Sequence, residues 1–269
     1  MLNTEKRNPK TVNIDKMSSA EMVKVIQEEN YNAVRAIDSE LDAIAEAIDA
    51  IVERMEKGGR LFYIGCGTSG RLGVLDASEC PPTYGVPHDM VIGLIAGGDG
   101  ALRRAVENAE DNDEAGARDI GAFELTLNDS VVGISVAGGA AYVAGALEFA
   151  KQKGALTIAL TCNAGSKIEN IADISIHPDT GAEVITGSSR MKAGSAHKMI
   201  LNMISTSVMV KLGYVYENLM INLKPTNVKL ESRMVRIVND ITGCGEARAR
   251  ELLDESGWVI RRAIEAYKK

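Results

Sequence analysis

Ile64-Gly-Cys-Gly-Thr-Ser-Gly-Arg-Leu-Gly-Val-Leu-Asp-Ala-Ser-Glu-Cys-Pro-Pro-Thr-Tyr-Gly85 is the segment that sets the architecture of this chain. It follows a short apolar run, residues 61–64, which is typical of a buried strand, and it leads into a helix expected to start at about Arg71. Glycine lets the backbone adopt positive φ and lets a ligand come close, while the first amides of a helix point unpaired toward an anion. The segment therefore predicts a strand, a phosphate-binding turn and a helix. The residues expected to hold the phosphate are Gly67, Thr68, Ser69 and Arg71.

The same glycines also fit the spacing Gly65-x-Gly67-x-x-Gly70 of a dinucleotide-binding turn. That pattern calls for an acidic residue about twenty positions further on, at the end of the next strand. Asp89 has roughly this spacing, but it stands before the next apolar run, residues 90–96, and not after it. A phosphate turn is therefore favoured over nicotinamide or flavin binding and over a purely structural turn.

Composition limits the classes of protein that fit. The chain has 269 residues and 45% hydrophobic residues, enough for a substantial core, and its net charge of -7 argues against general binding to nucleic acid or to an anionic membrane. The four cysteines are scattered without Cys-x-x-Cys spacing, no apolar run reaches the length of a membrane span, and the Met1 end does not read as a signal peptide. These features predict a reduced, cytoplasmic protein. The three histidines lie far apart in the sequence, so no metal site is expected.

Short apolar runs alternate with helical stretches from residue 60 to residue 177. The expected strands are 61–64, 90–96, 130–136, 156–161 and 173–177, and the clearest expected helices are 99–109 and 140–153. Strands that are apolar on both faces and alternate with helices predict a doubly wound α/β fold with a parallel, flavodoxin-like sheet. In such sheets ligands bind beyond the carboxyl ends of the strands.

The two ends of the chain are expected to be helical. Ser18 and Glu21 have the spacing of a capping box, and apolar residues recur every three or four positions after Tyr31, which predicts one helix over 31–57. The expected organisation is an N-terminal polar arm with helices at 1–57, a phosphate-binding domain at 58–225 and a small C-terminal helical segment at 226–269.

Two further segments resemble the first turn. Gly187, Ser188 and Ser189 precede a helix of about twenty residues, flanked by Arg190 and Lys192, so a second anion-accepting helix start is expected there. Residues 133–142 form another strand, glycine turn and helix, in which Ser135 is the hydroxyl available before Tyr142. The turn within 133–142 is a weaker phosphate site than the turn within 65–70, and a purely structural role explains it about equally well.

Acidic residues cluster after the expected helix at 99–109, and most of them fit a solvated helix end. Glu110 belongs to this cluster, and Glu79 stands nine residues after Gly70. Two glutamates near a phosphate turn, with no metal-ligand spacing, indicate acid-base chemistry on a phosphorylated small molecule. A serine hydrolase is excluded because no Gly-x-Ser-x-Gly elbow is present.

Several motifs resemble those of the N-acetylmuramic acid 6-phosphate etherases of the sugar isomerase (SIS) superfamily, over about residues 4–245. They are the opening Thr4-Glu-Lys-Arg-Asn-Pro-Lys-Thr11, the segment 65–85, Ala105-Val-Glu-Asn-Ala-Glu-Asp111, the segment 186–198 and Asn218-Leu-Met-Ile-Asn-Leu-Lys-Pro-Thr-Asn227. The run Asp76-Ala-Ser-Glu-Cys-Pro-Pro-Thr83 is the most specific to that family. The glycine turn alone belongs to many sugar-phosphate binders.

The resemblance implies cleavage of the D-lactyl ether of N-acetylmuramic acid 6-phosphate, in cell-wall amino sugar recycling. The open-chain sugar loses its C2 proton, lactate leaves from C3, and water adds to the unsaturated aldehyde. Glu79 matches the proton donor to lactate and Glu110 matches the base at C2, so their environments should differ. Positions matching the phosphate-holding or site-closing motifs are Thr68, Ser69, Ser188, Ser189 and Lys192. A homodimer, no metal and no organic cofactor are implied.

Some positions depart from the family pattern. Ala137 stands where a serine is expected, and the loss of a charge-assisted hydrogen bond would weaken phosphate binding by about 1.5–3 kcal/mol. Ser135 offers compensation, because related glucokinase regulatory proteins use the equivalent serine. His197 replaces a common glutamine, and the C-terminal segment is shorter than usual. These departures leave a non-catalytic sugar-phosphate sensor as an alternative, and an aldose-ketose isomerase as a third reading.

Overall fold

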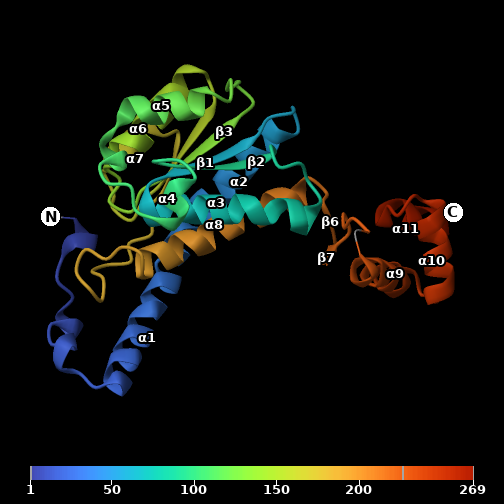
Figure 1. Ribbon diagram of the computed structural model, residues 1–269, viewed down its shortest axis with the longest axis horizontal. Helices are drawn as coiled ribbons and strands as arrows, with labels where there is room; N and C mark the ends of the chain where they lie inside the picture. Colours follow the sequence, from blue (N-terminus) through green and yellow to red (C-terminus); the bar gives the residue numbers. More distant parts are fainter. Residues whose placement is uncertain (1, 226, 269) are drawn as a thin grey trace.

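The computed structural model describes residues 2–225 and 227–268, and a five-stranded parallel sheet forms its centre (Figure 1). The strands are β1 (Leu61–Gly65), β2 (Val91–Ile95), β3 (Ser130–Ile134), β4 (Leu156–Leu160) and β5 (Ile174–Ile176). Their order is β2-β1-β3-β4-β5, the flavodoxin-like order of a doubly wound sheet. The α/β fold class expected from the sequence is confirmed, and each of the five expected strands is present.

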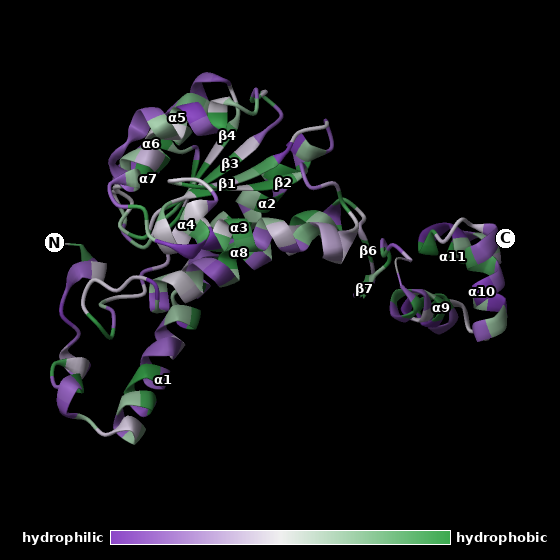
Figure 2. Ribbon diagram, viewed as in Figure 1, coloured by the Kyte–Doolittle hydropathy of each residue, from purple (hydrophilic) through white to green (hydrophobic). Residues whose placement is uncertain are grey.

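Helices cover both faces of this sheet because the strands are apolar on both sides. One face packs against α2 (Leu41–Met55) and α3 (Gly67–Tyr84), with α8 (Lys192–Lys211) beyond them. The other face packs against α5 (Asp113–Gly121), α6 (Ala141–Gln152) and α7 (Lys167–Ile171). Successive residues alternate between the faces, since Tyr63 belongs to the first core and Phe62 to the second. The apolar strands between these layers are visible in Figure 2.

The N-terminal segment differs from the single helix expected over 31–57. Three short 3-10 turns, η1 (Asn3–Glu5), η2 (Pro9–Thr11) and η3 (Ile14–Lys16), precede α1 (Ser19–Arg35). Ser18 and Glu21 form the expected capping box at the start of α1. The chain then breaks at η4 (Asp38–Glu40) before α2 begins. The apolar spacing continues across this break because Ile37, in the turn, is buried in the same core as both helices.

The helix expected over 99–109 was also wrong. The structure has a single turn, α4 (Gly100–Arg103), followed by a loop and by the 3-10 turn η5 (Ala109–Asp111). Asn108 adopts a left-handed φ of 60°, which a helix does not accommodate and which asparagine tolerates better than most residues. Glu110 therefore lies in a short turn and not on a regular helix. The helix after β1 starts at Gly67, four residues before the expected Arg71.

The C-terminal part stands apart from the sheet in Figure 1. A hairpin of β6 (Val215–Tyr216) and β7 (Leu219–Met220) leads into α9 (Val228–Thr242), α10 (Glu246–Glu255) and α11 (Ile260–Lys268). These helices share their own apolar core, which includes Met234, Leu253 and Ile264. All three helices lie within the segment 226–269 that the sequence predicted to be helical, and the first begins at Val228. Within the described residues, no helix is both long and apolar enough to cross a membrane.

Candidate active site

The first element of the site is the amino terminus of α3, directly behind β1. Gly67 opens the helix with a φ of +52°, and no side chain of the described residues caps it at Cys66. The strand and the helix approach closely, since a Cβ on Gly70 would lie 2.6 Å from the carbonyl oxygen of Gly65. The first amides of α3 therefore stay open to an anion, with Thr68 in the same turn.

Arg71 fastens the segment after β2 beside this helix end. Its Nη2 donates to the carbonyl oxygen of Ala101 at 2.7 Å, and its Nε donates to that of Leu102 at 3.1 Å. A cavity of about 210 Å³ opens between the two segments, lined by Gly67, Arg71 and residues 105–110 among others. Arg71 was expected to hold the phosphate; it lies beside the expected phosphate turn, and its guanidinium donates these two hydrogen bonds to main-chain carbonyl groups.

Glu110 reaches the same cavity from η5. Burial, and then the carboxylates of Glu110 and Asp111, raise the pKa of the Cys66 thiol to about 12. Cys66 and Gly67 line the same cavity as Glu110, so the Glu110 side chain lies close to the start of α3. The structure brings together one expected catalytic glutamate and the expected phosphate turn, at the carboxyl ends of β1 and β2.

Glu79 lies elsewhere. It is exposed on α3, twelve residues after Gly67, and a helix of that length rises about 18 Å. Glu79 does not line the cavity that contains Glu110. This separation is longer than one hexose phosphate. A single copy of the chain therefore does not gather both expected catalytic glutamates around one sugar.

A second cavity, of about 310 Å³, lies between α3 and the first turns of α8. Thr68 lines it from α3, and the cations Arg190 and Lys198 line it from the loop before α8 and from α8 itself. Sequence reasoning did not select Lys198 as a binding residue. Its spacing of four residues from Gly194, on the same helix face, is the signal that could have found it.

The turn after β3 is built around Ser135 and Gly138. The hydroxyl oxygen of Ser135 accepts a hydrogen bond from the Gly138 amide at 3.1 Å, and Ser135 is buried. A Cβ on Gly138 would lie 2.2 Å from the Cβ of Ser166, so this position requires glycine. The Asn163 side chain donates to the carbonyl oxygen of Val136 at 2.9 Å. Ser135 therefore holds the turn in shape, and its hydroxyl retains a proton to donate.

The start of α8 is not the open anion site that the sequence predicted. The carboxylate of Glu183, fully buried, accepts hydrogen bonds from the amides of Lys192 at 3.1 Å and Ala193 at 3.0 Å. An acidic side chain of the protein thus takes the position that a phosphate would take. Ser188 and Ser189 lie half-buried in the loop just before it.

Lys192 was expected to hold the substrate, but it is almost completely buried. Its Nζ lies 2.6 Å from Oε2 of Glu29 on α1 and donates to the carbonyl oxygen of Ala182 at 2.6 Å. No local pattern in the sequence indicates this pairing, because Glu29 is 163 residues away along the chain. The Nζ of Lys192 is therefore engaged inside the protein and does not line either cavity.

Comparison with known proteins first defines the class. Residues 43–151 match the glucokinase regulatory protein N-terminal SIS domain, and residues 108–210 match the SIS domain. A phosphoheptose isomerase from Francisella tularensis has a TM-score of 0.55 and 21% identity, covering 72% of this chain and all 100% of that chain. One from Neisseria gonorrhoeae also has a TM-score of 0.55, with 18% identity, covering 71% of this chain and 98% of that chain. The chain has the fold of the SIS sugar isomerases.

Curated relatives define the family within that class. The N-acetylmuramic acid 6-phosphate etherase of Caldanaerobacter subterraneus is 53% identical over 97% of this chain and 85% of its own length. That of Serratia proteamaculans is 51% identical over 97% of this chain and 88% of its own length. At this identity and coverage, the chain belongs to the N-acetylmuramic acid 6-phosphate etherase family.

Proposed function

We propose that this protein is a lyase that cleaves the D-lactyl ether of N-acetylmuramic acid 6-phosphate, giving N-acetylglucosamine 6-phosphate and D-lactate. One observation carries the proposal. In a chain about half identical to proteins named N-acetylmuramic acid 6-phosphate etherase, Glu110 lies beside the uncapped start of α3. A phosphate needs such donors, and an elimination needs a base within reach of the sugar.

The chemistry assigns one role to each group. The amides at the start of α3, with the hydroxyls of Thr68 and Ser69, hold the phosphate. Glu110 takes the proton from C2 of the open-chain sugar, and Glu79 gives a proton to the lactate oxygen as the C3–oxygen bond breaks. Water then adds to the unsaturated aldehyde. During this hydration Glu79 takes a proton from the water whose oxygen bonds to C3, and Glu110 returns its proton to C2, so both glutamates regain their starting protonation states.

A homodimer resolves the separation of the two glutamates. Glu79 lies about 18 Å along α3 from Gly67, too far to serve the sugar held at that end of the same helix. The exposed faces of α3 and α8 carry apolar side chains, Leu75, Met203 and Val210, of the kind that subunit interfaces bury. We propose that a second copy packs on these helices and that its Glu79 completes the site.

Mixing two inactive variants tests the shared site. In a dimer of one Glu79→Gln chain and one Glu110→Gln chain, one site retains both glutamates and the other retains neither. Random association makes half of the dimers mixed, so activity should recover to about a quarter of the wild-type value. No recovery, with mixed dimers demonstrated by differently tagged chains, would contradict the proposal that the neighbour supplies Glu79.

We also propose that the protein works in the cytoplasm, in the recycling of cell-wall amino sugars. The four cysteines, Cys66, Cys80, Cys162 and Cys244, are free thiols, which fits a reducing compartment such as the cytoplasm. A product pair of an amino sugar phosphate and D-lactate fits recycling of cell-wall amino sugars. Fractionation of the native host followed by immunodetection tests the location.

A non-catalytic sugar-phosphate sensor is not favoured. The match of residues 43–151 to the glucokinase regulatory protein domain speaks for it. A sensor, however, needs neither an acid nor a base, whereas this chain keeps both Glu79 and Glu110. The relatives at about half identity over almost the whole chain are etherases by name.

The deciding experiment is to incubate the purified protein with N-acetylmuramic acid 6-phosphate and to measure D-lactate with a coupled dehydrogenase. Lactate release in the wild type and its loss in Glu79→Gln support the etherase. Binding of the sugar phosphate without lactate release would reject the etherase and favour the sensor.

A further inference from the structure

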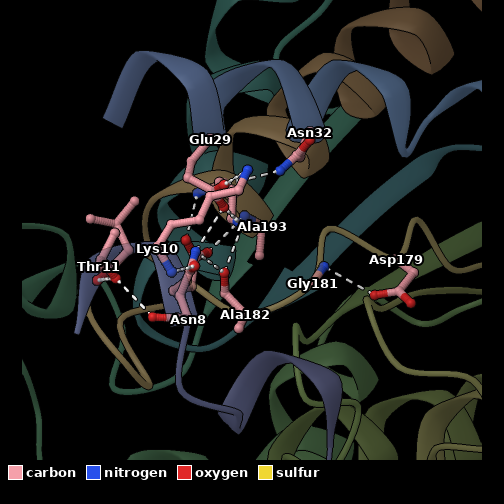
Figure 3. A network of polar contacts seen from close by, with 12 residues as sticks. Asn8, Lys10, Thr11, Glu29, Asn32, Asp179, Gly181, Ala182 and Ala193 are labelled. Carbon is pink, nitrogen blue, oxygen red and sulfur yellow. Dashed lines mark hydrogen bonds and ion pairs between the residues drawn. The ribbon is translucent and has the colours of Figure 1, made fainter. Parts of the chain in front are cut away.

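A buried ionic network joins four segments that are far apart in the sequence (Figure 3). Its centre is the ion pair between Lys192, at the start of α8, and Glu29, on α1, with 2.6 Å between Nζ and Oε2. Both side chains are almost inaccessible, with 2% and 3% of their surface exposed. A buried pair of this kind contributes little net stability, because desolvation offsets most of the attraction. The role of this ion pair therefore lies in the geometry that it imposes on the segments it joins.

The N-terminal arm, residues 2–18 before α1, supplies two further hydrogen-bond donors to Glu29. Asn8 donates to Oε2 at 2.8 Å, and Lys10 donates to Oε1 at 2.9 Å from the exposed side. Burial alone would raise the pKa of Glu29, but the hydrogen bonds from Lys192 and Lys10 outweigh it and lower the pKa to about 2. Glu29 is thus a permanent anion at neutral pH, held by the arm on one side and by α8 on the other.

The same network holds both ends of the loop that carries Ser188 and Ser189. At the first end, Asn8 and Lys192 donate to the carbonyl oxygen of Ala182, and Thr11 Oγ1 donates to that of Val184 at 2.8 Å. At the other end, Glu183 binds the first amides of α8. The residues between, 185–191, are exposed or half-buried, and one of them, Arg190, lines the cavity that also contains Thr68 and Lys198.

The arm also reaches the other candidate phosphate turn. Asn163 donates to Thr4 Oγ1 at 3.1 Å and to the carbonyl oxygen of Val136 at 2.9 Å, and the Asn3 amide donates to its Oδ1 at 3.1 Å. Thr4 is buried there. The arm therefore contacts the first end of the Ser188–Ser189 loop directly, and it is joined to the turn that carries Ser135 through Asn163.

We propose that Lys192 and Glu29 are positioning residues, which lock the N-terminal arm against α8 so that residues 185–191 adopt the shape that binds the phosphosugar. This inference rests on the proposed function for the identity of the ligand. In this arrangement Lys192 acts through the loop and does not touch the phosphate itself.

A double substitution separates positioning from stability. Glu29→Gln leaves Lys192 buried without a counterion, and Lys192→Met leaves the buried Glu29 with the exposed Lys10 as its remaining counterion, so both should lower the melting temperature and weaken binding. The double variant Glu29→Met/Lys192→Met has no unpaired buried charge, so its melting temperature should return close to wild type. Its Kd for N-acetylglucosamine 6-phosphate, measured by calorimetry, should stay about tenfold weaker than wild type. A Kd that recovers together with the melting temperature would overturn the proposal.

Two further variants complete the design. Thr11→Val removes the hydroxyl that donates to Val184 with little change in volume, and it should weaken the same Kd about threefold in a folded protein. An unchanged Kd in Thr11→Val would also overturn the proposal. Glu53→Gln is the matched control, because Glu53 pairs with Lys57 on the exposed side of α2, and it should alter neither quantity. Since the readout is binding of the product, the test stands even where the wild type releases no lactate.

Discussion

Lowering the pH from 7 to 3 should cost the folded protein about 2 kcal/mol through Glu29 alone. Burial opposes ionisation of this carboxyl, but the hydrogen bonds from Lys192 and Lys10 prevail and lower its pKa from 4.5 to about 2. That difference means that the folded protein favours the ionised over the protonated carboxyl by about 3 kcal/mol more than the unfolded chain does. Because the pKa is lower in the folded state, the contribution is complete above pH 4.5 and is lost as the pH falls toward 2.

Urea unfolding, followed by circular dichroism at several pH values between 7 and 3, measures this contribution. The wild type should be more stable than Glu29→Gln at pH 7, and that advantage should shrink by about 2 kcal/mol at pH 3. Between pH 7 and pH 5 the advantage should stay constant, since Glu29 is ionised in both the folded and the unfolded chain.

The exposed ion pair between Glu53 and Lys57 provides the control. Glu53→Gln, on an exposed surface pair, should change stability little at any pH. An advantage of the wild type over Glu29→Gln that is the same at pH 7 and pH 3 would refute the reasoning. It would mean that the carboxyl keeps an ordinary pKa in the folded protein and that the ion pair with Lys192 does not form.

Three other outcomes follow from the site. Glu79→Gln should stop lactate release yet permit exchange of the C2 proton with deuterated solvent, whereas Glu110→Gln should abolish both, as followed by proton NMR; exchange that survives only in the Glu110 variant would reverse the roles. Ala137→Ser should lower KM about tenfold or more, because it restores a hydroxyl to the turn after β3, and steady-state kinetics with an unchanged KM would show that this hydroxyl is dispensable. Gly138→Ala should lower the melting temperature by several degrees, since its Cβ would lie 2.2 Å from that of Ser166, and a wild-type melting curve would contradict that packing.

The sequence predicted the sheet well because its strands are short apolar runs with clear limits. It failed where the apolar spacing continued through a break, as at Ile37 between α1 and α2, and where a single residue left the helical region, as at Asn108. Periodicity records which side chains are buried, and a buried residue in a turn produces the same signal as one on a helix.

The candidate site was predictable only where its residues are neighbours in the chain. The glycine turn at the start of α3 and Thr68 in its first turn follow from the pattern of one short segment. The partners of Lys192 were hidden, because a lysine beside two serines at a helix start has the same sequence pattern whether it faces a ligand or a buried carboxylate 163 residues away. The distance between Glu79 and Glu110 was hidden for a similar reason, since it depends on the length of α3 and not on the motif.

The starts of α3 and α8 differ in whether an acidic side chain binds their first amides. The protein's own Glu183 occupies the start of α8, while the start of α3 is left uncapped. Of these two helix starts, that of α3 is therefore the one with amides free to bind an anion. We expect the phosphate of the proposed substrate to bind at that end, which would fix the direction in which the sugar lies before its ring is contacted.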